Sequence, residues 1–120
     1  MASDRIRMLP LFMPVVSARD LDWQPAADVY RTGKGWLIKF DLAGVRPEDV
    51  ECLAARNQLT VRGVRRDCLL EEGCSHYRME ISYRRFERRI DIPGDLSSAR
   101  ITTEYRDGML VIRVCWESPS

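Results

Sequence analysis

The sequence of 120 residues lacks the features that usually indicate an enzyme or a membrane protein. It has one histidine, His76, and no Ser or Asp signature beside it that would complete a nucleophile triad. Lys34 between two glycines indicates a turn and not a Walker-type phosphate loop. No apolar run approaches the ~18 residues of a membrane-spanning helix. We therefore expect no enzymatic activity, no cofactor and no membrane span.

An excess of charge of one sign is also missing, because the formal net charge is only +1. Four arginines cluster at positions 84, 85, 88 and 89, but Glu87 and Asp91 lie among them. Mixed signs favour a solvated or ion-paired strand face over a nucleic-acid site. The sequence therefore predicts no nucleic-acid partner.

The four cysteines match no disulfide framework, so reduced thiols and a cytoplasmic location are the default expectation. Cys52 and Cys115 fall in strand-like runs and are expected to pack as small apolar residues. Cys68 and Cys74 lie near His76, but a structural zinc site needs four ligands and a closer cysteine pair, so we expect no metal. These two cysteines could instead be oxidised on a flexible loop.

What the sequence does contain is short runs of alternating apolar and polar residues. The clearest is the segment 101–114, where Asp107-Gly108 predicts a type I′ hairpin turn. Further strands are predicted at 25–32, 36–42, 50–55, 59–63, 77–83 and 86–92. Turn signals at intervals of about 8–12 residues, without an amphipathic helix, predict an all-β sandwich of about seven to eight strands.

Two segments depart from this pattern. A polar loop at 64–76 is long enough to be functional, and it could carry the strand at 77–83 away from its own sheet. Residues 1–22 contain an apolar run without a period, which predicts a short flexible arm that offers binding surface. The alternative is that this arm packs onto the domain or is frayed. Its candidate binding residues are Met8, Leu9, Leu11, Phe12 and Met13.

Several motifs in order resemble the α-crystallin domain of the small heat-shock proteins. They are Asp41-Leu42-Ala43-Gly44-Val45 with Pro47-Glu48-Asp49-Val50, Leu59-Thr60-Val61-Arg62-Gly63, Phe86-x-Arg88 before Ile92-Pro93, and Tyr105-Arg106-Asp107-Gly108-Met109-Leu110. The resemblance covers about residues 23–115, with a short tail at 116–120. It implies an immunoglobulin-like sandwich and an ATP-independent holdase that captures unfolding client proteins.

The resemblance also implies a homodimer formed by exchange of the strand at 77–83. Arg88 lies on the apolar face of its strand, where a charge must be paired. The resemblance implies that Arg88 holds carboxylates across the dimer, and the alternative is an intrachain pair with Glu80 or Glu104. The expected dimer-interface residues are Arg88, Tyr77, Met79, Ile81, Tyr83 and Phe86.

A groove for clients or for a neighbour's tail is implied between the strands at 50–55 and 99–105. Its expected lining residues are Val50, Cys52, Ala54, Ile101 and Thr103. The sequence departs from the family at Arg84 and Thr103, where Gly and Ala are usual. The tail after Val114 lacks the family's Ile-x-Ile/Val motif, which favours a dimer or small oligomer. The alternative function is that of a p23/CS-like adaptor, a monomer that binds one folded partner.

Overall fold

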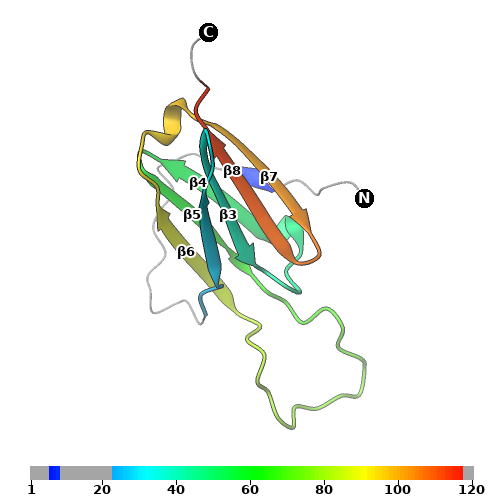
Figure 1. The fold of residues 1–120 in the computed structure, drawn as a ribbon. Helices are drawn as coiled ribbons and strands as arrows, with labels where there is room; N and C mark the ends of the chain where they lie inside the picture. Colours follow the sequence, from blue (N-terminus) through cyan, green and yellow to red (C-terminus); the bar gives the residue numbers. More distant parts are fainter. Residues whose placement is uncertain (1–5, 9–22, 118–120) are drawn as a thin grey trace.

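Eight strands form two four-stranded sheets in the computed structural model, which describes residues 6–8 and 23–117 (Figure 1). One sheet has the order β1-β4-β5-β6 and the other the order β2-β3-β8-β7. Every pairing is antiparallel except that of β1 with β4. The strands are β1 (Arg7–Met8), β2 (Ala27–Arg31), β3 (Gly35–Asp41), β4 (Val50–Ala55), β5 (Gln58–Val64), β6 (Arg85–Asp91), β7 (Arg100–Arg106) and β8 (Met109–Cys115). The predicted all-β sandwich is confirmed.

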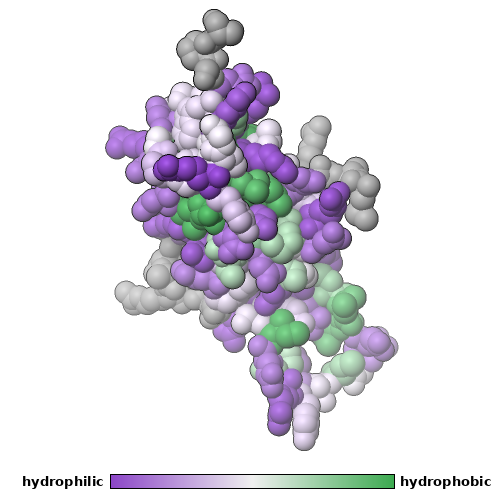
Figure 2. Space-filling model, viewed as in Figure 1, coloured by the Kyte–Doolittle hydropathy of each residue, from purple (hydrophilic) through white to green (hydrophobic). Residues whose placement is uncertain are grey.

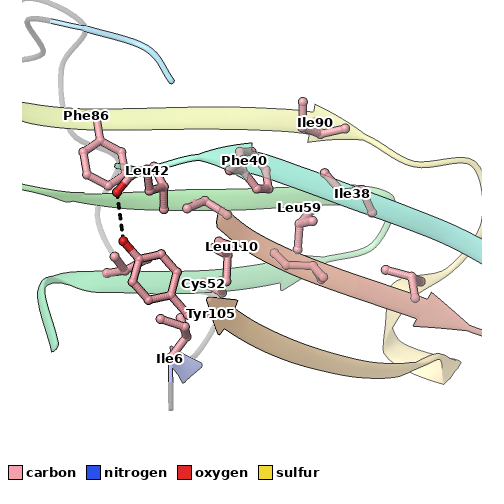
Figure 3. Packing of buried hydrophobic residues seen from close by; sticks show 14 of the residues in the cluster. Ile6, Ile38, Phe40, Leu42, Cys52, Leu59, Phe86, Ile90, Tyr105 and Leu110 are labelled. Carbon is pink, nitrogen blue, oxygen red and sulfur yellow. Dashed lines mark hydrogen bonds between the residues drawn. The ribbon is translucent and has the colours of Figure 1, made fainter. Parts of the chain in front are cut away.

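Alternating residues of both sheets fill the space between them. Ile38 of β3 pairs in register with Ile112 of β8, and Phe40 pairs with Leu110. All four side chains are fully buried, as is Leu59 of β5, which faces them from the opposite sheet (Figure 3). The period of two that predicted the strands therefore marks the face that each strand buries.

The β7–β8 turn has the backbone that its sequence predicts. Asp107 has φ of 55° and Gly108 has φ of 77°, so both central residues are left-handed, as a type I′ turn requires. A Cβ on Gly108 would lie 3.0 Å from the Cα of Ala43. The turn therefore needs glycine at position 108 both for its conformation and for the close approach of Ala43.

The strand predicted at 77–83 is not formed within the chain, and that prediction is wrong for the single copy. Residues 65–84 connect β5 to β6 as a loop that projects away from the sandwich (Figure 1). The alternation is present, but no edge of either sheet lies beside this segment to pair with it. The other predicted strands are present, with their ends shifted by at most two residues.

Strand β1 was not predicted. Its two residues pair in parallel with β4, Arg7 with Glu51 and Met8 with Cys52. Two 3-10 helices, Pro47–Asp49 and Leu96–Ser98, occupy connections. No helix in the described ranges is long and apolar enough to cross a bilayer.

Candidate functional site

The projecting loop leaves the sandwich through a fixed neck. The backbone N–H of Arg65 donates to the carbonyl of Arg84 at 3.1 Å, and its Nε donates to the carbonyl of Ser82 at 2.8 Å. The indole Nε1 of Trp23 donates to the same Arg84 carbonyl at 3.2 Å. The guanidinium carbon of Arg65 lies 4.2 Å from the centroid of the Trp23 ring, a cation–π contact. These contacts hold the two ends of the loop together and fix the direction in which it projects.

Beyond the neck, the loop exposes apolar side chains that its own chain does not cover. Tyr77 is 99% exposed, Leu69 is 90% exposed and Ile81 is 59% exposed, and Met79 is also exposed. Figure 2 shows hydrophobic side chains on this protruding part of the molecule. Contiguous exposed apolar surface on a small domain usually marks an interaction site. Of the other expected dimer residues, Tyr83 is half-buried and Phe86 is fully buried in the core.

Strand β2 offers a sheet edge. It pairs only with β3 among the described residues, and it stands at the end of its sheet. Val29 and Tyr30 on this strand are both exposed. An edge strand presents backbone donors and acceptors that can pair with a strand from another chain. Among the described residues, the β2 edge is therefore open to a further strand, and residues 77–83 are a largely exposed segment with strand-like alternation.

Arg88 lies on β6, at the side of the sandwich where the chain enters β2. Its Nη1 donates to the carbonyl oxygen of Pro25 at 2.9 Å, and Pro25 itself is fully buried. Glu104, one of the partners considered from the sequence, pairs instead with Arg113 at 3.2 Å. Within the single chain, the Arg88 guanidinium therefore ties one sheet to the segment that leads into the edge strand of the other.

The five residues expected to line the groove all face the space between the sheets. Val50 and Cys52 are fully buried, whereas Ala54, Ile101 and Thr103 are half-buried. The residue that covers this side of the core is Ile6, which belongs to the same hydrophobic cluster. Figure 3 shows Ile6 on the side of the core where Cys52 and Tyr105 lie. The expected groove is therefore partly filled by the chain's own N-terminal segment.

Of the expected arm residues, Met8 lies in β1 and is exposed. Leu9, Leu11, Phe12 and Met13 lie outside the described residues.

The outer face of the β1-β4-β5-β6 sheet carries charges of alternating sign. Glu51 accepts from Arg7 at 2.8 Å and from Arg62 at 3.0 Å. Glu87 is buried and pairs with Arg89 at 2.7 Å. Both carboxylates, with Arg7, Arg62 and neighbouring charged side chains, line a cavity of about 600 Å³. The mixed signs agree with the ion-paired strand face expected from the sequence.

The cysteines differ in burial, and Cys115 on β8 is half-buried. Cys52 is buried, and desolvation raises the pKa of its thiol to about 12. Cys68 and Cys74 are exposed on the projecting loop. Nε of Arg46 donates to the Cys68 sulfur at 3.2 Å, and this hydrogen bond is the main cause of a raised pKa for Arg46. His76 is also exposed, and no group of three possible metal ligands occurs within the described ranges.

Comparison with known proteins places this sandwich in a family. Residues 28–120 match the Hsp20/alpha crystallin family. This chain belongs to the Hsp20/alpha crystallin family. It is 32% identical over 90 residues to the 18 kDa heat shock protein of Streptomyces albus G, covering 72% of this chain and 61% of that protein. It is 23% identical to small heat shock protein C2 of Rickettsia felis, covering 84% of this chain and 66% of that protein. The chain thus spans less than two thirds of these relatives' length.

Solved structures of the Hsp20 family share the fold. The hspA protein of Xanthomonas axonopodis aligns with a TM-score of 0.64 and 30% identity, covering 79% of this chain and 95% of that one. Heat shock protein 16.0 of Schizosaccharomyces pombe aligns with a TM-score of 0.71 and 22% identity, covering 82% of this chain and 94% of that one. At that identity the second likeness shows the fold alone. These relatives give no support to the adaptor alternative.

Proposed function

We propose that this Hsp20-family protein is an ATP-independent holdase in the cytoplasm, which binds unfolding proteins and keeps them from aggregating. The observation that carries the proposal is the match of residues 28–120 to the Hsp20/alpha crystallin family, together with the exposed Met8 and the half-buried groove residues Ala54, Ile101 and Thr103. A protein that binds the unfolded form of a client withdraws it from aggregation by mass action, and this needs no nucleotide. The sequence has no phosphate loop that would bind one.

The client surface in this proposal is apolar and adaptable. It comprises the arm from Met8 to Met13 and the groove lined by Val50, Cys52, Ala54, Ile101 and Thr103. Methionine side chains adapt to differently shaped apolar partners, so many clients should bind, each weakly. The burial of Val50 and Cys52 in the single chain means that the groove must open before clients can reach these two residues.

The same proposal includes a homodimer in which residues 77–83 of one copy pair with the β2 edge of the other. Tyr77, Met79, Ile81 and Tyr83 alternate with polar residues, as a strand with one buried face requires. The exposed Val29 and Tyr30 on β2 supply apolar neighbours for such a strand. Pairing would satisfy the backbone groups of the edge and cover the apolar side chains of the loop at once.

Light scattering of a heat-labile client tests the proposed function. The client is heated with an equimolar amount of this protein, with and without ATP, and an unrelated soluble protein at the same concentration serves as the control. We expect suppression of scattering that ATP does not change. Unchanged aggregation of several different clients would contradict the holdase and favour an adaptor for one folded partner.

A further inference from the structure

Two of the cysteines lie together on the projecting loop, outside the core and outside residues 77–83. Cys68 and Cys74 are both exposed and neither forms a disulfide, and residues 69–73 lie between them. Cys52, by contrast, is buried. Oxidants select thiols by their exposure and by how readily they become thiolates, so the two loop cysteines are the accessible targets for an oxidant in solution.

A basic side chain contacts one of these two sulfurs. Nε of Arg46, on the connection between β3 and β4, donates to Sγ of Cys68 at 3.2 Å. The thiol lies 3.5 Å from the carbonyl oxygen of Arg66, to which it donates its own hydrogen. Nη1 of Arg46 is 3.7 Å from Glu48, a long and exposed pair that competes weakly for the charge. A cation beside a sulfur stabilises the negative charge of the attacking thiolate, so Cys68 is the cysteine placed to react first.

The backbone between the two cysteines already reverses direction. The N–H of Cys74 donates to the carbonyl oxygen of Glu71 at 3.3 Å, and Gly73 within this turn has φ of 91°. Glycine in that conformation is typical of a type II turn. Only two residues, both leucines with exposed side chains, separate Cys68 from the turn. The two sulfurs can therefore approach one another by rotation of a few exposed residues, without any change in the sandwich.

We propose that Cys68 and Cys74 form a dithiol site that hydrogen peroxide converts to a disulfide, and that this disulfide weakens the exchange of residues 77–83. The Cys68 thiolate attacks one peroxide oxygen, the O–O bond breaks, and the hydroxide released takes up the thiol proton as water. The Cys74 thiolate then attacks the sulfenic sulfur, forms the S–S bond and releases the second water. Two thiols are oxidised by two electrons in total, and one hydrogen peroxide is reduced to two waters. A cellular thiol such as glutathione reverses the step by thiol–disulfide exchange.

The disulfide shortens the connection that lets residues 77–83 lie as a strand. Such a strand extends about 23 Å from the neck, and the chain must return to the neck from its far end. Residues 65–77 can span about 40 Å when fully extended, which is ample. Once the two cysteines are joined, their Cα atoms are at most about 7 Å apart and the same connection spans only about 27 Å. The oxidised loop must be almost taut to reach a second copy, and this loss of conformational freedom opposes exchange.

The chemistry is tested on the full chain without reference to dimerisation. The reduced protein is treated with stoichiometric hydrogen peroxide, the remaining thiols are blocked with N-ethylmaleimide in denaturant, and peptide mass mapping locates the disulfides. We expect an intrachain bond between Cys68 and Cys74, with Cys52 recovered as a blocked thiol. Disulfides only between copies, or oxidation of Cys68 beyond the sulfenic acid without a disulfide, would overturn the dithiol site.

Two variants assign the roles of the residues around the site. Cys74→Ser should stop the reaction at the sulfenic acid of Cys68, which dimedone traps. Arg46→Gln should slow the loss of the Cys68 thiol. Arg100→Gln is its matched control, because it removes an exposed arginine whose partner is Glu117, outside the loop. Equal rates for the two arginine variants would contradict the role of Arg46.

Sedimentation velocity of the reduced and oxidised proteins tests the effect on exchange, which rests on the proposed dimer. We expect oxidation to shift the unaltered chain toward monomer and to leave Cys74→Ser unchanged. A disulfide at the expected position with no change in dimer mass would overturn the effect on exchange. A reduced chain that is already monomeric would contradict the proposed strand exchange, and the effect of the disulfide with it, and would leave the dithiol site intact.

Discussion

The phenolic hydroxyl of Tyr105 donates a hydrogen bond to the carbonyl oxygen of Leu42, 2.8 Å away, and also lies against the carbonyl of Val45 (Figure 3). Tyr105 is on β7, and the two carbonyls belong to the connection between β3 and β4. One buried side chain therefore holds the chain where it crosses from one sheet to the other.

Tyr105→Phe removes only the hydroxyl, so both carbonyls lose this donor, although the Leu42 carbonyl still accepts from the backbone N–H of Val45 at 2.9 Å. Such a loss typically costs about 1–3 kcal/mol of the free energy of unfolding. Urea denaturation followed by far-UV circular dichroism measures it. Tyr30→Phe is the matched control, because it removes the same hydroxyl from an exposed side chain. Its free energy of unfolding should differ from that of the unaltered chain by no more than about 0.5 kcal/mol. Equal stability of the two variants would contradict the structural role of Tyr105.

Gly108→Ala tests the type I′ turn. Alanine at φ of 77° is strained, and its Cβ would press on Ala43, so we expect a loss of about 1–2 kcal/mol in the free energy of unfolding. Gly33→Ala is the control, since no atom lies within 4 Å of the added Cβ there. Thermal unfolding of the two variants checks this, and a Gly108→Ala protein as stable as Gly33→Ala would argue against the turn.

The buried thiol of Cys52 makes stability depend on alkaline pH. Its pKa is raised from 9.0 to about 12 in the folded chain, so above pH 9 the unfolded thiol loses its proton while the folded thiol keeps it. The contribution of Cys52 is therefore complete below pH 9 and falls as the pH rises toward 12.

Urea denaturation between pH 8 and pH 11 measures this contribution as the difference in the free energy of unfolding between the unaltered chain and Cys52→Ala. We expect that difference to shrink as the pH rises. Cys74→Ala is the control, because it removes an exposed thiol outside the core. A constant difference for Cys52→Ala would mean that the thiol is not desolvated.

The sequence predicts most of the sandwich because nearly every strand has one buried face. Ile38 and Phe40 on β3, like Leu110 and Ile112 on β8, show this face as a period of two. Strand β1 cannot be predicted from the sequence because it is only two residues long, too short to show a period. Its position depends on pairing with β4, a long-range contact that the local sequence does not indicate. The period at 77–83 predicts a strand, but it does not identify the sheet edge with which that strand would pair.

Long-range contacts account for the other features of the structure that the sequence does not predict. The neck of the loop joins Trp23, Arg65 and Arg84, three segments about twenty or more residues apart, and none of them is marked by a local pattern. Arg88 is half-buried on the apolar face of its strand, and the sequence correctly predicts that its charge needs a partner. That partner is the backbone carbonyl of Pro25, a group that every residue carries. Residue type alone therefore cannot identify the hydrogen-bond partner of Arg88.

Arg88→Ala tests the link between β6 and the β2 edge. Without the hydrogen bond to Pro25, the edge on which we propose that a second copy docks loses a support. The loss of a charge-assisted hydrogen bond of ~1.5 kcal/mol would correspond to about tenfold weaker dimerisation. Sedimentation equilibrium over a dilution series measures this dissociation constant. Arg100→Ala is the control, because Arg100 makes an exposed pair with Glu117. An unchanged dimer mass for Arg88→Ala at high dilution would reject the role.

Sedimentation velocity of Ile81→Asp beside Leu69→Asp tests most directly whether two copies exchange residues 77–83. Both residues are exposed and apolar and lie on the same loop, but only Ile81 belongs to the segment that we propose is exchanged. We expect Ile81→Asp to sediment as a folded monomer of 13.9 kDa while Leu69→Asp remains a dimer like the unaltered chain. An Ile81→Asp protein that stays dimeric at the same concentrations would contradict the exchange.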